Sequence, residues 1–216
     1  MAINIALDGP SAAGTSTIAK RLAKKLNYVH LDTGAMYRCV AYKALSTGVS
    51  MEDEAALCAM INDTVIELTS DGSVILDGKT VSNEIRTDKI SMGASKVSAF
   101  KEVRALLVAQ QQKMAENKGY IMDGRDIGTV VLPNAELKVF MTASAEARAQ
   151  RRYAENLAKG FDSDLNKIIE EIKQRDWQDT HREHSPLKKA DDAVVLDTSD
   201  LNIDEVVSAI EAMLPL

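Results

Sequence analysis

The stretch that most constrains the fold of this 216-residue chain is residues 3–26. A short apolar run ends at Gly9, the loop GPSAAGTST follows, and after Ser16 the apolar residues recur with helical spacing. This order predicts a buried strand, a loop and a helix. In such a loop, backbone N–H groups and the positive end of the helix can hold phosphate groups. The stretch therefore favours a nucleotide site on an α/β fold.

The loop departs from the usual phosphate-binding pattern at one position. The pattern G-x-x-x-x-G-K-[ST] has lysine where this chain has Thr15. Gly9 and Gly14 are present, and Ser16 stands where a hydroxyl holds Mg²⁺. Thr15 offers a hydroxyl where lysine would add a cation at the outer phosphates. Two interpretations stay open from this stretch alone: a nucleotide site that lacks one cation, or a glycine turn without a ligand.

Four further strand-like runs follow, at residues 28–32, 120–123, 137–142 and 193–197. Helical patterns lie between them. The alternation predicts a doubly wound α/β fold, with a five-stranded parallel sheet and helices on both of its faces.

The ends of three predicted helices are marked in the sequence. One covers residues 101–118 and stops at Gly119. A second covers residues 144–159, with Ser144 as its cap and Gly160 after it. The third opens with Asn202 and Glu205, which form a capping pair.

Residues 65–82 break the alternation of strands and helices. Short β-rich runs are separated by Asp71-Gly72 and Asp77-Gly78, and Asp-Gly is a strong signal for a tight turn. We expect a three-stranded antiparallel meander inserted into the α/β core, followed by a short helix with Ile90, Ala94 and Val97 on one face.

The net charge, the apolar runs and the cysteines exclude some classes of protein. The net charge of −6 argues against a nucleic-acid coat or a membrane-surface protein, because both need a broad basic face. The start of the chain lacks the pattern of a signal peptide, and no apolar run reaches the ~20 residues that span a bilayer. Cys39 and Cys58 are expected to be free, buried thiols. We therefore expect a cytoplasmic protein and, since no large amphipathic stripe is left over, a monomer.

Arginines and carboxylates gather where predicted strands end. Arg38 lies one turn into the helix after residues 28–32, and Arg125 follows residues 120–123 between Asp123 and Asp126. In doubly wound folds, ligands bind outside the carboxyl ends of the strands. These side chains predict an anion site there, and surface ion pairs are the alternative.

The stretch RDWQDTHR carries a second arginine pattern. Arg175, Asp179 and Arg182 are spaced to share one face of a helix, and such a face can bind a phosphate together with sugar hydroxyls. An ordinary ladder of salt bridges is the alternative. Trp177 lies off this face and is expected in the core.

A third arginine pattern precedes Gly160. Arg148, Arg151 and Arg152 recur at helical spacing, and a second helical pattern follows the glycine. Two hinged helices suit a lid that closes over a polyphosphate. A solvated basic face explains these three residues equally well.

Taken together, these motifs resemble bacterial cytidylate kinases, within the nucleoside monophosphate kinase family of P-loop folds. LDTGAMYR and MDGRDIGTVVLP are the most specific, and GASKVSAFKEVR, QRDWQDTHREHSPL and DDAVVLDTS extend the resemblance over nearly the whole chain. Thr15 is the one departure. The resemblance implies a P-loop core at 1–61 and 99–216, an inserted monophosphate-binding region at 62–98 and a helical lid at 151–167.

The resemblance also implies an activity: Mg²⁺-dependent transfer of the ATP γ-phosphate to CMP or dCMP. The residues implied as catalytic are Arg38, Arg125, Arg152 and Arg182. Those implied at ATP are Gly9, Pro10, Ser11, Ala12, Ala13, Gly14, Thr15, Ser16, Thr17, Arg148 and Arg151, with Ser16 also at the metal. Those implied at CMP are Thr33, Tyr37, Arg38, Ser95, Arg104, Asp123, Arg125, Asp126, Arg175, Asp179 and Arg182.

Within these implied roles, Asp126 can accept a hydrogen bond from the cytosine amino group, while Ser95 and Arg104 can donate to N3 and O2. Uracil presents an acceptor to the same carboxylate, which predicts a preference for cytosine. The absence of the loop lysine predicts slower transfer. Two alternatives remain: a nucleotide-binding module without transfer activity, and a kinase for another monophosphate, UMP or AMP.

Overall fold

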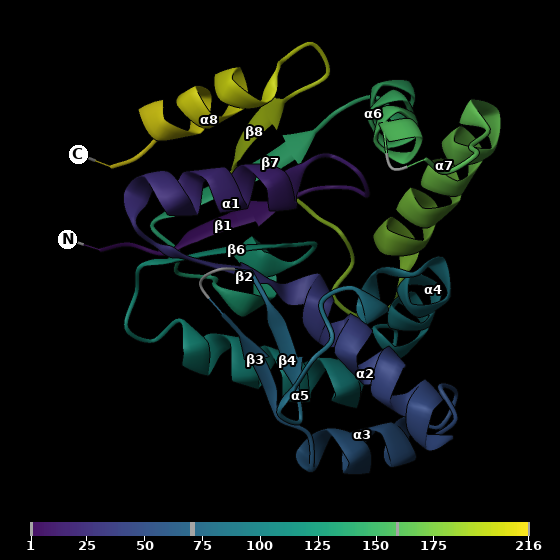
Figure 1. The fold of residues 1–216 in the computed structure, drawn as a ribbon. Coiled ribbons are helices and arrows are strands. Elements are labelled where there is room, and N and C mark those ends of the chain that lie inside the picture. Colours follow the sequence, from purple (N-terminus) through teal and green to yellow (C-terminus); the bar gives the residue numbers. More distant parts are fainter. Residues whose placement is uncertain (1, 70–71, 159, 216) are drawn as a thin grey trace.

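The computed structural model describes residues 2–69, 72–158 and 160–215. Its centre is a five-stranded sheet built from β1 (Ile5–Asp8), β2 (Val29–Asp32), β6 (Tyr120–Gly124), β7 (Leu137–Thr142) and β8 (Val194–Asp197). The strand order is β2-β6-β1-β7-β8, and all neighbouring strands are parallel (Figure 1). The predicted doubly wound sheet is confirmed.

Helices cover both faces of this sheet. Figure 1 shows α1 (Thr15–Leu26) and α8 (Ile203–Ala212) above it, and α2 (Thr33–Thr47) and α5 (Lys101–Met114) below it. Side chains alternate along a strand, so Ile5 and Leu7 of β1 pack beneath α1 and α8 while Ala6 packs on the opposite face. The carboxyl ends of β1, β2 and β6 therefore lie together between the two helical layers.

The predicted meander is also present. After α3 (Glu54–Asn62), strands β3 (Ile66–Leu68), β4 (Val74–Leu76) and β5 (Lys79–Thr80) form an antiparallel sheet. Asp77 and Gly78 have positive φ angles of 49° and 78°, as a tight turn between β4 and β5 requires. In the other predicted turn, Asp71 lies outside the described residues.

The inserted segment continues with a short 3₁₀ turn, η1 (Glu84–Arg86), and α4 (Asp88–Val97). Val74 and Leu76 of β4 share one hydrophobic core with buried side chains of α2, α3 and α5. The boundaries 62–98 of a separate monophosphate-binding region therefore stay a prediction.

A pair of helices lies beyond the carboxyl end of β7 (Figure 1). Helices α6 (Ala145–Ala158) and α7 (Leu165–His181) pack through a small apolar cluster that contains Ala149, Ile168 and Ile172. Ser144 Oγ accepts the N–H of Ala147 at 3.1 Å, so the predicted cap is confirmed. Lys159, the predicted end of the first helix, lies outside the described residues. The lid boundaries 151–167, which take in parts of both helices, stay a prediction.

The structure corrects four details. Trp177 is 62% exposed and stacks on His181, so its expected place in the core is wrong. Arg182 follows the last residue of α7 in an extended conformation, so it is not on the helical face of Arg175 and Asp179. Helix α5 ends at Met114, because the chain turns back into β6 through Lys118 and Gly119 at positive φ. Cys58 is only partly buried, whereas Cys39 is buried.

The capping box of Asn202 and Glu205 at the start of α8 is confirmed. Within the described ranges, no helix combines the length and the apolar character that crossing a bilayer requires.

Candidate active site

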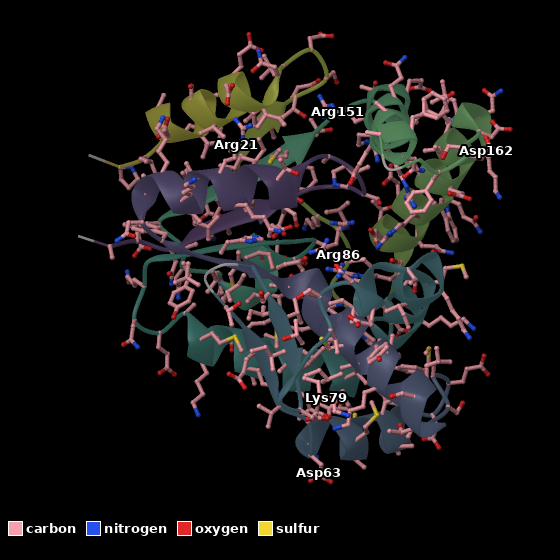
Figure 2. All side chains as sticks on the ribbon, in the orientation of Figure 1. Arg21, Asp63, Lys79, Arg86, Arg151 and Asp162 are labelled. Atoms are coloured by element: carbon pink, nitrogen blue, oxygen red, sulfur yellow. The ribbon has the colours of Figure 1, made fainter. Side chains whose placement is uncertain are left out.

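One large cavity of about 2420 Å³ opens at the carboxyl ends of β1, β2 and β6. Its lining comes from the phosphate loop, α2, α4, the segment after β6, and both helices of the α6–α7 pair. Figure 2 labels four lining residues from different elements, namely Arg21, Arg86, Arg151 and Asp162. Segments far apart in the sequence therefore meet around a single space.

The phosphate loop lies on the floor of this cavity. Residues 10–17 line it. Gly9 lies beneath the loop, where an added Cβ would come within 2.7 Å of the Met141 carbonyl oxygen. Gly14 adopts a φ of 90° directly before α1, a conformation that suits glycine. Close packing therefore favours glycine at position 9, and backbone conformation favours it at position 14.

Thr15 points toward the sheet. Its side chain is buried, and Oγ1 donates a hydrogen bond to Oδ2 of Asp123 at 3.3 Å. Ser16 Oγ donates to the same oxygen at 2.6 Å. Thr15 therefore does not aim a donor where the loop lysine would place its cation. The carboxylate of Asp123 faces the phosphate loop, and the predicted contact of Asp123 with CMP stays a prediction.

The predicted acceptor arginines converge on the cavity. Arg38 is paired with Asp32 and Arg125 with Asp179, each at 2.7 Å. Arg175 and Arg182 also line the cavity, and neither has a carboxylate partner among the described residues. The four arginines come from three separate segments, so the tertiary structure creates a strongly positive region.

Several arginine N–H groups in this region are buried without an acceptor. They are Nε of Arg38, Nε of Arg175 and Nη2 of Arg182. Burial lowers the pKa of Arg175, and the nearby charge of Arg125 lowers it further. Burial also lowers the pKa of Arg182, with a contribution from Arg104. Buried donors without acceptors are costly, so this arrangement indicates an anion site.

A second group of predicted residues lies deeper in the cavity. Arg104 is 4% exposed, forms an ion pair with Asp126, and donates from Nη1 to the Ser98 carbonyl oxygen at 3.1 Å. Its guanidinium lies over the Tyr37 ring, 5.3 Å from the centroid. Burial raises the pKa of Tyr37 to about 12. Ser95 lines the same cavity.

The chain from residue 5 to residue 215 matches the sequence model of the cytidylate kinase family. A curated cytidylate kinase from Geobacillus kaustophilus is 52% identical over 211 residues, which are 96% of this chain and 94% of that protein. Another from Bacillus thuringiensis is 53% identical over the same shares. The chain belongs to the cytidylate kinase family. It is therefore an enzyme, a nucleotide-dependent phosphotransferase.

Solved structures support the fold of this family member. A shikimate kinase from Bacteroides thetaiotaomicron aligns over the full length of both chains with a TM-score of 0.52 at 14% identity. An uncharacterized protein from Eubacterium ventriosum covers 99% of this chain and 98% of its own, with a TM-score of 0.55 at 12% identity. At such low sequence identity, the structural similarity supports the P-loop kinase fold alone.

The three arginines on α6 of this cytidylate kinase family member differ in their surroundings. Arg151 and Arg152 line the cavity, and Arg151 donates from Nη1 to Thr198 Oγ1 at 3.2 Å. Arg148 is 4% exposed and is not part of the lining. It forms a two-pronged ion pair with Asp176 and donates to the Ser11 carbonyl oxygen at 2.9 Å. Arg148 thus supports the phosphate loop through the Ser11 carbonyl without lining the cavity, whereas the sequence analysis placed it at ATP.

Sequence reasoning missed two buried polar residues that contact parts of this site. Asp8 accepts the backbone N–H groups of Ile127 and Gly128 at 2.8 and 2.7 Å, which fixes the segment directly after Asp126. Burial raises the pKa of Asp8 to about 6. Its place at a strand end, just before Gly9, was an available signal. His30 lies 2.6 Å from Asp123 through Nε2, and nothing in its sequence neighbourhood pointed to that contact.

Proposed function

We propose that this protein transfers the γ-phosphate of ATP to CMP or dCMP and yields CDP or dCDP. One observation carries the proposal: a buried Arg104–Asp126 pair and a cluster of arginines with unpaired N–H groups line the same cavity as a phosphate loop. The first group suits a pyrimidine base, the second suits its phosphate, and the loop suits a nucleoside triphosphate.

Arg38, Arg125 and Arg182 are the proposed ligands of the CMP phosphate. The Nε of Arg38 and an Nη of Arg182 are buried donors without partners, which a phosphate oxygen would satisfy. Thr33 lines the cavity beside them, with its hydroxyl donating to the Asp123 carbonyl oxygen at 2.7 Å. The phosphate would also relieve the repulsion among these guanidinium groups.

The base would lie near Tyr37, Ser95, Arg104 and Asp126. Asp126 holds Arg104 through Oδ2, which leaves Oδ1 to accept from the amino group of cytosine. Arg104 and Ser95 are the proposed donors to N3 and O2. Asp179 and Arg175 are the proposed ligands of the ribose, and Asp179 is held in place by Arg125.

Mg²⁺ fits the groups around the phosphate loop. Ser16 Oγ and Asp123 Oδ2 are 2.6 Å apart, and both are hard oxygen ligands. Mg²⁺ in phosphoryl-transfer sites is held by one or two protein oxygens of this kind together with substrate phosphates and water. No cluster of three or more metal-ligating side chains exists in the described ranges, which suits a metal held mainly by ATP. When bound, Mg²⁺ would offset charge on the β and γ oxygens.

The protein's own task in the reaction is positioning and charge neutralisation. The attacking group is a phosphate oxygen that is largely ionised at neutral pH, so no general base is required. Arg38, Arg125 and Arg182 would orient this oxygen, and Arg151 and Arg152 would meet the triphosphate from the lid side. Closure of α6 and α7 over the cavity would keep water from accepting the phosphoryl group.

A phosphotransfer assay with CMP, dCMP, UMP and AMP tests the proposal. We expect ADP release with CMP and dCMP well above the ATPase background, and much less with UMP or AMP. Calorimetric binding of CMP without ADP release would instead favour a binding module without transfer activity. The proposed working form is a monomer, which sedimentation in the presence of both nucleotides checks.

A further inference from the structure

We propose that His30 is a positioning residue that holds Asp123 in the orientation in which its Oδ2 faces Ser16. The inference deepens the proposed function, because Asp123 and Ser16 are the proposed protein ligands of the metal. It concerns a residue that neither the motifs nor the phosphate-loop pattern single out.

The sheet brings the two side chains together. Asp32 of β2 is in register with Asp123 of β6, and His30 lies two residues earlier on the same strand face. His30 is therefore the diagonal neighbour of Asp123 across the parallel pair of β2 and β6. The imidazole Nε2 lies 2.6 Å from Oδ1 of Asp123, and both side chains are about 7% exposed. In this proposal Nε2 is the donor and the carboxylate oxygen is the acceptor of the contact.

The two carboxylate oxygens have different partners. Oδ1 is taken by His30, while Oδ2 accepts from the hydroxyls of Ser16 and Thr15. These hydroxyls belong to the first turn of α1, directly after the proposed nucleotide-binding loop. His30 alone among these donors belongs to the sheet, which does not depend on the loop's conformation. It therefore fixes the rotation of the carboxylate whether or not the loop is occupied.

The contact from His30 to Asp123 is important in this chain because position 15 is threonine rather than lysine. Asp123 is buried, and a buried carboxylate without donors is costly. Within the part of the chain that the structure describes, His30 is the basic side chain paired with Asp123, and no lysine or arginine is. The threonine and serine hydroxyls are neutral and rotatable. Loss of the imidazole would leave Oδ1 without a donor and free the carboxylate to turn away from Ser16.

The test uses two substitutions in the full chain and a readout that needs no catalysis. His30→Leu removes the donor, and His30→Gln keeps an amide N–H near the position of Nε2. Binding of Mn²⁺ together with ADP is measured by electron paramagnetic resonance, and thermal unfolding reports on the fold. We expect His30→Leu to weaken Mn²⁺ binding by about tenfold or more, and His30→Gln to restore most of it. Equal Mn²⁺ affinity in wild type and a folded His30→Leu variant would overturn the proposal.

Nitrogen NMR of the unmodified protein provides a second test of the proposed role of His30. The chain has three histidines, so selective labelling with substitution of one residue at a time assigns each ring. We expect His30 to carry its proton on Nε2, and an Nε2 without a proton would overturn the proposal even if the variants fail to fold. Neither arm contains CMP, so a failure of CMP phosphotransfer in the substrate panel is distinguishable from a failure of this inference.

Discussion

The guanidinium of Arg125 is joined to the carboxylate of Asp179, with Nε 2.7 Å from Oδ2. The contact links the segment after β6 to the last turns of α7, which are 54 residues apart in the chain. A proposed phosphate ligand is thus oriented by a proposed ribose ligand. Assembly of the proposed CMP site therefore depends on the contact between α7 and the segment after β6.

Asp179→Asn tests this dependence. The neutral amide removes the negative charge that holds Arg125. The repulsion between the positive charges of Arg125 and Arg175 is then less well compensated. A hydrogen bond to a charged group contributes roughly 1.5–3 kcal/mol, so we expect the KM for CMP to rise by about tenfold or more. Steady-state kinetics at saturating ATP measure it. An unchanged KM for both CMP and dCMP would show that Asp179 orients neither Arg125 nor the sugar.

Asp126→Asn tests recognition of the base. The amide nitrogen can donate to the uracil oxygen, which the carboxylate repels, so the preference for CMP over UMP should fall by about tenfold or more. The measurement is the ratio of kcat/KM for the two substrates. Because Asp126 and Arg104 form a buried pair, thermal unfolding serves as the control for lost stability. A folded variant with an unchanged ratio would remove Asp126 from base recognition.

Thr15→Lys tests the missing loop cation. Thr15 Oγ1 is directed at Asp123, so the wild-type loop aims no cation from this position at the outer phosphates. One well-placed donor or cation stabilises a transition state by roughly 3 kcal/mol, which sets a ceiling of about a hundredfold on the gain in kcat. Thr15→Met is the matched uncharged control. A kcat for Thr15→Lys no higher than that of Thr15→Met contradicts the prediction.

The pH dependence of stability tests the surroundings of Asp8. Burial raises its pKa in the folded state from 3.8 to about 6, so its contribution to stability is greatest below pH 3.8 and is lost as the pH rises through 6. Between these limits the unfolding free energy of wild type should fall by about 3 kcal/mol relative to Asp8→Asn, as an order of magnitude. Urea unfolding of both proteins at intervals from pH 4 to 7.5 provides the comparison. Parallel curves would mean that Asp8 has an ordinary pKa.

The local elements were predictable because each depends on short-range patterns. The strand–loop–helix order around Gly9 and Gly14, the Asp77-Gly78 turn and the capping box at Asn202 follow from spacing and backbone preferences that act over a few residues. The positions of Arg38 and Arg125 after predicted strands pointed to an anion site, and the resemblance to cytidylate kinases, carried by LDTGAMYR and MDGRDIGTVVLP, identified the family.

Contacts between segments that are far apart in the chain could not be predicted from the sequence. The sequence does not show which side of α7 is covered, and in the structure α7 packs against α6 through Ile168 and Ile172 while Trp177 is exposed. Arg148 and Arg151 have equivalent sequence settings, yet one is buried against Asp176 and the other lines the cavity. Which side of a helix becomes buried depends on the elements that fold against it.

The sequence by itself determined the family, the order of the elements and the absence of lysine at position 15. The tertiary structure decided that Thr15 turns toward Asp123, that His30 meets the same carboxylate from the neighbouring strand, and that the arginine N–H groups remain buried without acceptors. The physical reason is that hydrogen bonding and burial depend on distances across strands and helices, which spacing along the chain does not contain.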